Sequence, residues 1–129
     1  MSQFNIGSNL ILNTDITVGG GEVKTGATFN GKPVYFECKS GTVSSSANVA
    51  TDIAQLGTSV DRIISVGGTI YGNNQVDRYP LNNFITSGDY SSCWTPVSNG
   101  KIVVRLQCAN SNRLGASVCA WAYYTKTTD

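Results

Sequence analysis

The sequence predicts an all-β protein, an antiparallel β-sandwich of about seven or eight short strands with little helix. Two Asn-Gly pairs, at residues 30–31 and 99–100, each separate two strand-like runs. Asn-Gly favours the two-residue turn of a β-hairpin, because both positions accept positive φ. Gly, Ser, Thr and Asn are plentiful while only 13% of residues are charged, which is typical of a β-rich protein with a surface of hydroxyls and amides.

With 129 residues, of which 40% are hydrophobic, the chain suits one domain. We expect the sandwich over residues 22–129, preceded by a segment, 1–21, that forms a short stalk or a trimer-forming strand. The first residues lack both a basic stretch and an apolar run, and no segment is long and apolar enough to cross a bilayer. The sequence therefore predicts a soluble protein with no secretion signal and no membrane insertion.

The first Asn-Gly turn predicts a hairpin over residues 22–39. Its two faces should carry apolar pairs on one side and opposite charges on the other, as a half-buried hairpin requires. The expected pairs are Phe29 with Lys32, Ala27 with Val34, Thr25 with Phe36, Val23 with Cys38, Lys24 with Glu37 and Glu22 with Lys39.

Three segments follow. The run ANVATDIAQL, residues 47–56, predicts a strand, although Val49, Ile53 and Leu56 also fit one face of a helix. DRIISVGGTIY, residues 61–71, predicts a strand that bulges or bends at its Gly-Gly pair. GNNQVDRYPLNN, residues 72–83, is expected to form a long exposed loop.

The second Asn-Gly turn places Ile102, Val104 and Leu106 in one inward row. The expected pairs are Thr95 with Val104, Cys93 with Leu106, Ser91 with Cys108, Trp94 with Arg105 and Ser92 with Gln107. Trp94 above Arg105 predicts a cation–π pair, and the indole either covers the sheet or binds a ligand.

A third hairpin, turning through ANSNRLGAS at residues 109–117, should join this strand to the last one. Its longer turn leaves two registers open, with either Trp121 and Tyr123 or the set Ala120, Ala122 and Tyr124 facing the core. The four cysteines are irregularly spaced and form no CxxC pair, so we expect small buried thiols rather than disulfides or a metal site, with Cys119 able to lie opposite Cys108.

Several chemistries are excluded by composition. The chain has no histidine, which removes the Ser-His-Asp and Cys-His arrangements and His-ligated zinc. The carboxylates stand singly, and GGGEVKTG, residues 19–26, lacks the Gly-Lys-Ser/Thr ending of a phosphate loop. Nine Lys and Arg against eight Asp and Glu give no basic stripe for nucleic acid. We expect no catalytic residue, no cofactor and no nucleic-acid partner.

Four segments carry a family resemblance: FNGKPVYFECKSGTV, VDRIISVGGTIYG, RYPLNN and the terminal RLGASVCAWAYYTKTTD. In this order they resemble the "xGKPVYRK", "VASIxG" and "YVTLxYTKTTD" strands in the C-terminal module of phage and prophage tail-fibre and receptor-binding proteins. The sequence departs from that pattern at Phe36, where the family has Arg, at residues 49–53, where "VAHGI" is frequent, and in its four cysteines.

The resemblance implies a β-sandwich at the distal end of a trimeric fibre, made in the bacterial cytoplasm, exposed on the virion and bound to other virion or tail proteins. Such modules contact the bacterial cell surface, often its glycans. The exposed loop and the Trp94 face supply groups that bind sugars, since Asn and Asp bind hydroxyls and Tyr stacks on a ring. The expected ligand-binding residues are Tyr71, Asn73, Asn74, Asp77, Arg78, Tyr79 and Trp94.

Two alternatives stay open. A structural virion protein, such as a decoration, head-fibre or tail-tip component, would use its surface mainly for apolar, symmetric contacts with other chains. A depolymerase acting on host glycans is disfavoured by the missing histidine and the unpaired carboxylates.

Overall fold

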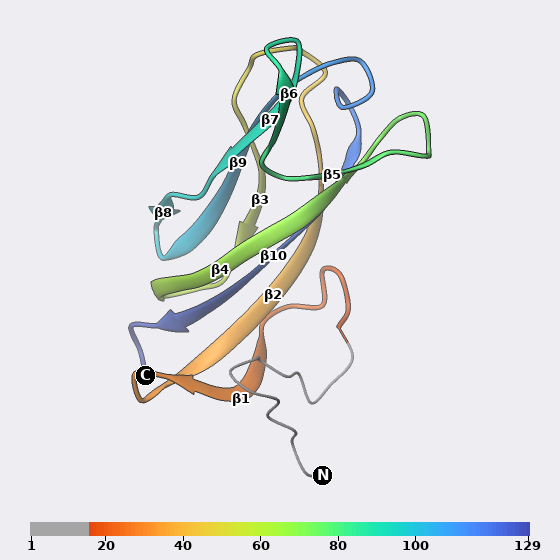
Figure 1. Ribbon diagram of the computed structural model, residues 1–129. Coiled ribbons are helices and arrows are strands. Elements are labelled where there is room, and N and C mark those ends of the chain that lie inside the picture. The colour runs from red at the N-terminus through yellow and green to blue at the C-terminus, as the bar shows by residue number, and fades with distance from the viewer. Residues whose placement is uncertain (1–15) are drawn as a thin grey trace.

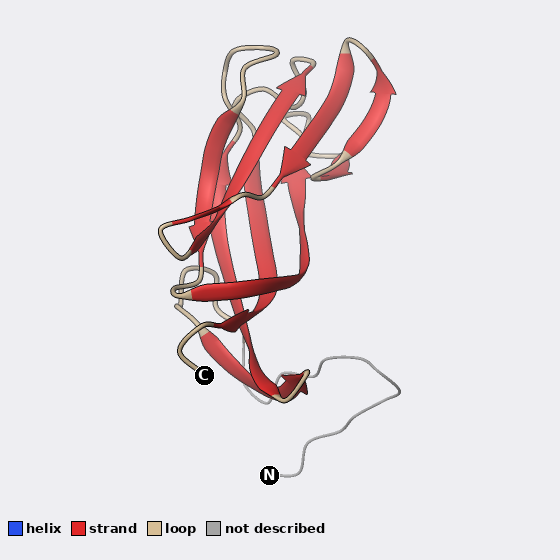
Figure 2. Ribbon diagram, turned by 90° about the vertical axis from the view of Figure 1, so that its left-hand side faces the viewer, coloured by secondary structure: helices blue, strands red, loops and turns tan. Residues whose placement is uncertain are grey.

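The computed structural model describes residues 16–129, which form ten strands in two antiparallel sheets and no helix (Figures 1 and 2). The strands are β1 (Val23–Phe29), β2 (Lys32–Thr42), β3 (Thr51–Leu56), β4 (Val60–Tyr71), β5 (Arg78–Pro80), β6 (Asn83–Thr86), β7 (Asp89–Trp94), β8 (Val97–Ser98), β9 (Lys101–Ala109) and β10 (Ser117–Lys126). This confirms the predicted all-β class. Within the described range there is therefore no helix that could span a bilayer. Of the predicted stalk over residues 1–21, residues 1–15 lie outside the described residues, and residues 16–21 form no strand.

The first sheet has the order β1-β2-β10-β4-β5 and the second has β3-β9-β7-β6, with β8 beside β9. β9 and β10 thus belong to different sheets, and the predicted third hairpin is wrong. A two-residue Asn-Gly turn allows only a hairpin, whereas residues 110–116 are long enough to cross from one sheet to the other. The last strand becomes the centre of the first sheet, paired with β2 and β4.

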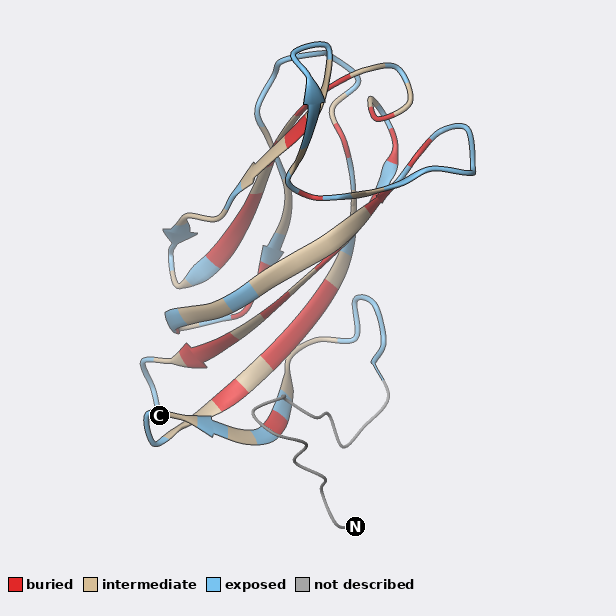
Figure 3. Ribbon diagram, in the orientation of Figure 1, coloured by how far each residue is buried: buried red, intermediate tan, exposed pale blue. Residues whose placement is uncertain are grey.

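The core lies between the sheets and takes most of its side chains from β10, β4, β9 and the end of β3. Figure 3 colours the buried residues red. Ala120, Ala122 and Tyr124 face it, and each is at most 1% exposed. Of the two registers that the sequence left open for the last strand, the one with Ala120, Ala122 and Tyr124 facing the core is correct. Trp121 and Tyr123 lie on the opposite face of the first sheet, with their ring centroids 5.7 Å apart. The Tyr123 ring centroid also lies 4.9 Å from that of Phe36.

The first hairpin keeps the predicted register only near its turn, where Phe29 pairs with Lys32. A bulge between Lys24 and Thr28 then shifts the pairing, so that Val23 lies opposite Phe36. Gly26, with φ of 85°, adopts the left-handed conformation inside this bulge. The predicted pairs of Lys24 with Glu37 and Glu22 with Lys39 are therefore wrong.

Two expectations about β4 and the segment after it also change. The Gly67–Gly68 segment pairs regularly with β10, and the irregularities fall nearer the start of β4. Gly67 is required for another reason, because a Cβ there would lie 2.3 Å from the Trp121 ring. Part of the predicted exposed loop 72–83 is a strand, because β5 pairs with β4, and Leu81 within it is buried, with 5% of its surface exposed. The exposed turn covers residues 73–77.

Glu22 closes the end of the sandwich beside the turn between β3 and β4. Its carboxylate accepts hydrogen bonds from Tyr124, from Lys126 Nζ at 2.8 Å and from Thr58 Oγ1 at 2.7 Å. Burial alone would raise the pKa of Glu22, but the bonds from Lys126, Tyr124 and Thr58 outweigh it and lower that pKa below the usual 4.5. The ionised carboxylate therefore stabilises the fold at neutral pH.

This contribution should depend on pH. A lowered folded-state pKa stabilises the protein above the unfolded pKa near 4.5, and the gain is lost as the pH falls through the folded value. Glu22→Gln should cost about 1 kcal/mol above pH ~5.5, and its difference from wild type should shrink below pH ~4.5. Urea denaturation across a pH series measures this, and a difference that stays constant down to pH ~3 would contradict it.

Candidate functional site

The second hairpin fixes the outer face of the second sheet. Its register is the predicted one, with Trp94 opposite Arg105 and Ser92 opposite Gln107. Ile102, Val104 and Leu106 form the predicted buried row, so the alternate residues of β9 face outward. The β7–β9 pairing ends at Trp94, and the Pro96 carbonyl then accepts a hydrogen bond from the Val103 N–H at 2.8 Å. The predicted pair of Thr95 with Val104 is therefore wrong.

A bulge in β3 adds two polar residues to the same face. Asp52 pairs with Arg105 and Gln55 pairs with Val103, with a register shift between Asp52 and Ala54. In a regular strand, residues three apart point to opposite faces. The extra residue of the bulge, Ile53, lets both Asp52 and Gln55 face outward.

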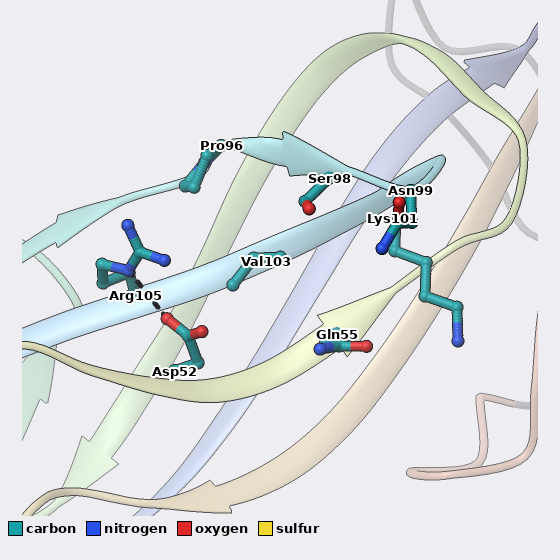
Figure 4. A pocket seen from close by; sticks show the side chains of 8 residues that line it. All are labelled: Asp52, Gln55, Pro96, Ser98, Asn99, Lys101, Val103 and Arg105. Carbon is teal, nitrogen blue, oxygen red and sulfur yellow. Dashed lines mark hydrogen bonds and ion pairs between the residues drawn. The ribbon is translucent and has the colours of Figure 1, made fainter.

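These residues line a groove of about 590 Å³ whose floor is β9 and whose walls are β3 and the β8 segment (Figure 4). The lining side chains are those of Asp52, Gln55, Pro96, Ser98, Asn99, Lys101, Val103 and Arg105. Arg105 Nε donates to Asp52 Oδ1 at 2.7 Å, and this hydrogen bond raises the pKa of Arg105. Lys101 makes no ion pair within residues 16–129.

Trp94 extends the face beyond the groove. Asp52, Arg105 and Trp94 form one row across β3, β9 and β7. The predicted cation–π pair is wrong, since the Arg105 guanidinium binds Asp52 and the described cation–π contacts lie elsewhere. Trp94 is 40% exposed and lines a smaller hollow of about 310 Å³ with Val66 and Leu81. An exposed indole therefore stands beside a groove rich in hydrogen-bonding groups.

The other six predicted site residues come together at the far end of β4 and β5, but most of their polar groups are used internally. Asn73 Nδ2 donates to the carbonyls of Ser111 and Leu114, both at 2.8 Å. Asn74 bonds to Asp77 at 2.7 Å, and Tyr79 accepts from Asn112 at 2.6 Å. These bonds fasten turn 73–77 to the crossover.

Tyr71 and Arg78 complete this cluster on its exposed side, with the guanidinium 5.1 Å from the ring centroid. The two side chains border a shallow hollow of about 250 Å³ beside Gly72. Arg113, which the sequence reading passed over, anchors the crossover from below and is fully buried. These contacts hold the turn and the crossover together, while the Tyr71 and Arg78 side chains stay exposed.

Within the described residues no cluster of three or more His, Cys, Asp or Glu side chains is placed to hold a metal ion. The groove residues Asp52, Gln55 and Lys101 were missed by the sequence reading. Arg105 could have been found, because the hairpin register already placed it beside Trp94. Comparisons with protein-family models, with curated proteins and with solved structures find no match for this chain.

Proposed function

We propose that this chain is a glycan-binding module of the tail-fibre receptor-binding type, which attaches a phage or prophage particle to the bacterial cell surface. The row of Asp52, Arg105 and Trp94 beside the groove carries the proposal. A sugar ring presents hydroxyls at its edge and C–H groups on its face. The fixed carboxylate–guanidinium pair offers an acceptor and donors to the hydroxyls, and the indole stacks on the ring.

The volume of the groove suits a small ligand or a short segment of a glycan chain. At about 590 Å³ it lies within the range of small-molecule sites, roughly 300–1,000 Å³. Gln55, Ser98 and Asn99 add uncharged donors and acceptors along its length. The module binds and does not catalyse.

The family resemblance supports the same proposal through its placement. GKPVY lies at the start of β2, VDRIISVGGTIYG in β4, RYPLNN in β5 and the terminal motif in β10. These strands belong to the first sheet, whereas the groove lies on the second. We propose that the first sheet is the shared scaffold, and that the second carries specificity in a virion-exposed homotrimer joined to other tail proteins.

The test is binding of labelled protein to a panel of bacterial strains, with and without prior removal of surface polysaccharide. Binding should fall when the polysaccharide is stripped. Trp94→Ala should weaken binding about tenfold, because one aromatic stacking contact is worth about 1–1.5 kcal/mol. Flow cytometry over a concentration series gives the apparent affinity.

The matched control is Phe84→Ala, which removes an aromatic side chain that is 72% exposed on the same sheet but outside the groove. Its affinity should stay within about twofold of wild type. The double variant Tyr71→Ala, Arg78→Ala tests the far cluster in the same way. Wild-type binding by Trp94→Ala, together with a loss in the Tyr71 and Arg78 variant, would move the site to that cluster.

A structural virion role is the second candidate, favoured by one observation. Phe84 and Ile85, 72% and 56% exposed, are adjacent on β6, the edge strand of the second sheet. Exposed apolar side chains on an unpaired edge suit contact with another chain. A glycan array with no hits, together with assembly onto particles that Phe84→Asp and Ile85→Asp abolish, would favour this role.

A further inference from the structure

Two thiols from strands far apart in the sequence meet in the first sheet. Cys38 in β2 and Cys119 in β10 have their sulfur atoms 3.2 Å apart, and all four cysteines are free thiols. In the β2–β10 ladder, Trp121 lies opposite Cys38 and Cys119 lies opposite Ser40, so the two cysteines are diagonal neighbours on one face. The outer aromatic cluster of Trp121 and Tyr123 lies on that same face.

The other two cysteines provide a comparison inside the same molecule. Cys93 and Cys108 are also diagonal neighbours on paired strands, β7 and β9, but on the diagonal of the opposite sense. The twist of an antiparallel pair makes its two diagonals unequal, and only one of them brings side chains together. Within the described residues no hydrogen bond joins the sulfurs of Cys93 and Cys108, whereas one joins Cys38 and Cys119.

We propose that Cys38 and Cys119 are a disulfide-forming pair that closes by exchange with a low-molecular-weight disulfide such as oxidised glutathione. This inference does not depend on the proposed glycan binding. Closure requires the sulfurs to move from 3.2 Å to a bond of about 2.05 Å, which side-chain rotation in two neighbouring strands can supply.

The surroundings assign an order to the two steps. Cys38 is 5% exposed, and burial together with the neighbouring Cys119 raises the pKa of its thiol to about 12. Cys119 is only partly buried, so its thiolate attacks one sulfur of the oxidant, forms a mixed disulfide and releases one glutathione thiolate. The Cys38 proton passes to that thiolate as the Cys38 sulfur attacks, and the proton that Cys119 released to solvent is taken up by the second glutathione thiolate.

The Cys38 sulfur then attacks Cys119 Sγ, which breaks the mixed disulfide and releases the second glutathione. Two protein thiols are oxidised to one disulfide, and one oxidised glutathione is reduced to two thiols. The new bond links residues 81 apart in the sequence, so it constrains the unfolded chain strongly.

The experiment incubates the folded full chain with oxidised glutathione and then alkylates it after denaturation. We expect two alkylated thiols instead of four, a mass loss of about 2 Da, and a peptide in which Cys38 is linked to Cys119. The melting temperature should rise by on the order of 10 °C and return after reduction with dithiothreitol. Cys119→Ser should show none of these changes.

The variant Cys93→Ala, Cys108→Ala keeps the proposed pair and should still lose about 2 Da. If that variant folds poorly, the peptide map of the wild-type protein decides alone. Four alkylated thiols after oxidation would overturn the proposal. So would a glutathione that stays on Cys119, a link between Cys93 and Cys108, or a link between two chains.

Discussion

Replacing Arg113 with alanine is expected to destabilise the fold by about 3–5 kcal/mol. The Arg113 side chain is fully buried, and its guanidinium donates to Asp89 Oδ1 at 2.9 Å, Ser91 Oγ at 2.8 Å and Asn83 Oδ1 at 2.8 Å. It also lies 3.9 Å from the ring centroid of Tyr79. Alanine would leave these polar groups without their donor beneath the crossover, and a buried charge partner left alone is costly.

Urea denaturation of both proteins measures the loss. Arg62→Ala is the control, because Arg62 is exposed and, among residues 16–129, its side chain makes no ion pair and lies 6.0 Å from the Phe29 ring centroid. Its effect should stay within about 0.5 kcal/mol of wild type. Arg113→Lys keeps the charge but loses the planar fork of donors, and should fall between wild type and Arg113→Ala. A loss below about 1 kcal/mol for Arg113→Ala would show that the network is unimportant.

Arg113 also shows why the sequence predicted one end of the molecule poorly. In ANSNRLGAS, an arginine among Asn, Ser and Gly is typical of a solvent-exposed turn. It is buried only because β6, β7 and the crossover meet above it, and no local pattern encodes that meeting. The Asn residues of turn 73–77 carry the same ambiguity, since an amide that binds a ligand and an amide that fastens a turn look alike in sequence.

A hairpin was predictable where a two-residue turn fixed the register and no bulge followed it. The pairing of Trp94 with Arg105 is correct because no bulge intervenes between β7 and β9 over those residues. The predicted pairing of Val23 with Cys38 is wrong because a bulge at Gly26 shifts the register. The position of Gly26 in the sequence does not by itself indicate a bulge. The placement of β10 failed because periodicity identifies a strand but not its neighbours.

The groove was half predictable for the same reason. Arg105 and Trp94 come from the correct register, whereas Asp52 and Gln55 face outward together only because of the bulge at Ile53. Of the ambiguous run of residues 47–56, only residues 51–56 form the predicted strand, since residues 47–50 lie in a turn and loop before it. Regular alternation along that strand would have assigned one of those two side chains to the core. A bulge at a binding face is a common device for re-aiming a side chain.

The bulge leads to the second large effect, which Gly41→Ala should produce. A Cβ at Gly41 would lie 2.3 Å from the Ile53 carbonyl oxygen and 3.1 Å from its carbon. Those atoms are backbone and cannot rotate away, so β3 would have to retreat by about 1 Å. We expect a loss of about 2–3 kcal/mol in stability. Because Ile53 sets the positions of Asp52 and Gln55, the proposed glycan binding should also weaken, by about tenfold.

Gly88→Ala provides the matched comparison, since the nearest atom to its added Cβ, Thr86 Oγ1, is 4.0 Å away. That variant should match wild type within about 0.5 kcal/mol and bind host cells equally well. Binding must be measured well below the melting temperature, so that lost affinity is not simply lost folding. If Gly41→Ala were destabilised but bound normally, the close approach of β2 to Ile53 would serve packing alone. A groove that depends on the bulge requires both properties to change together.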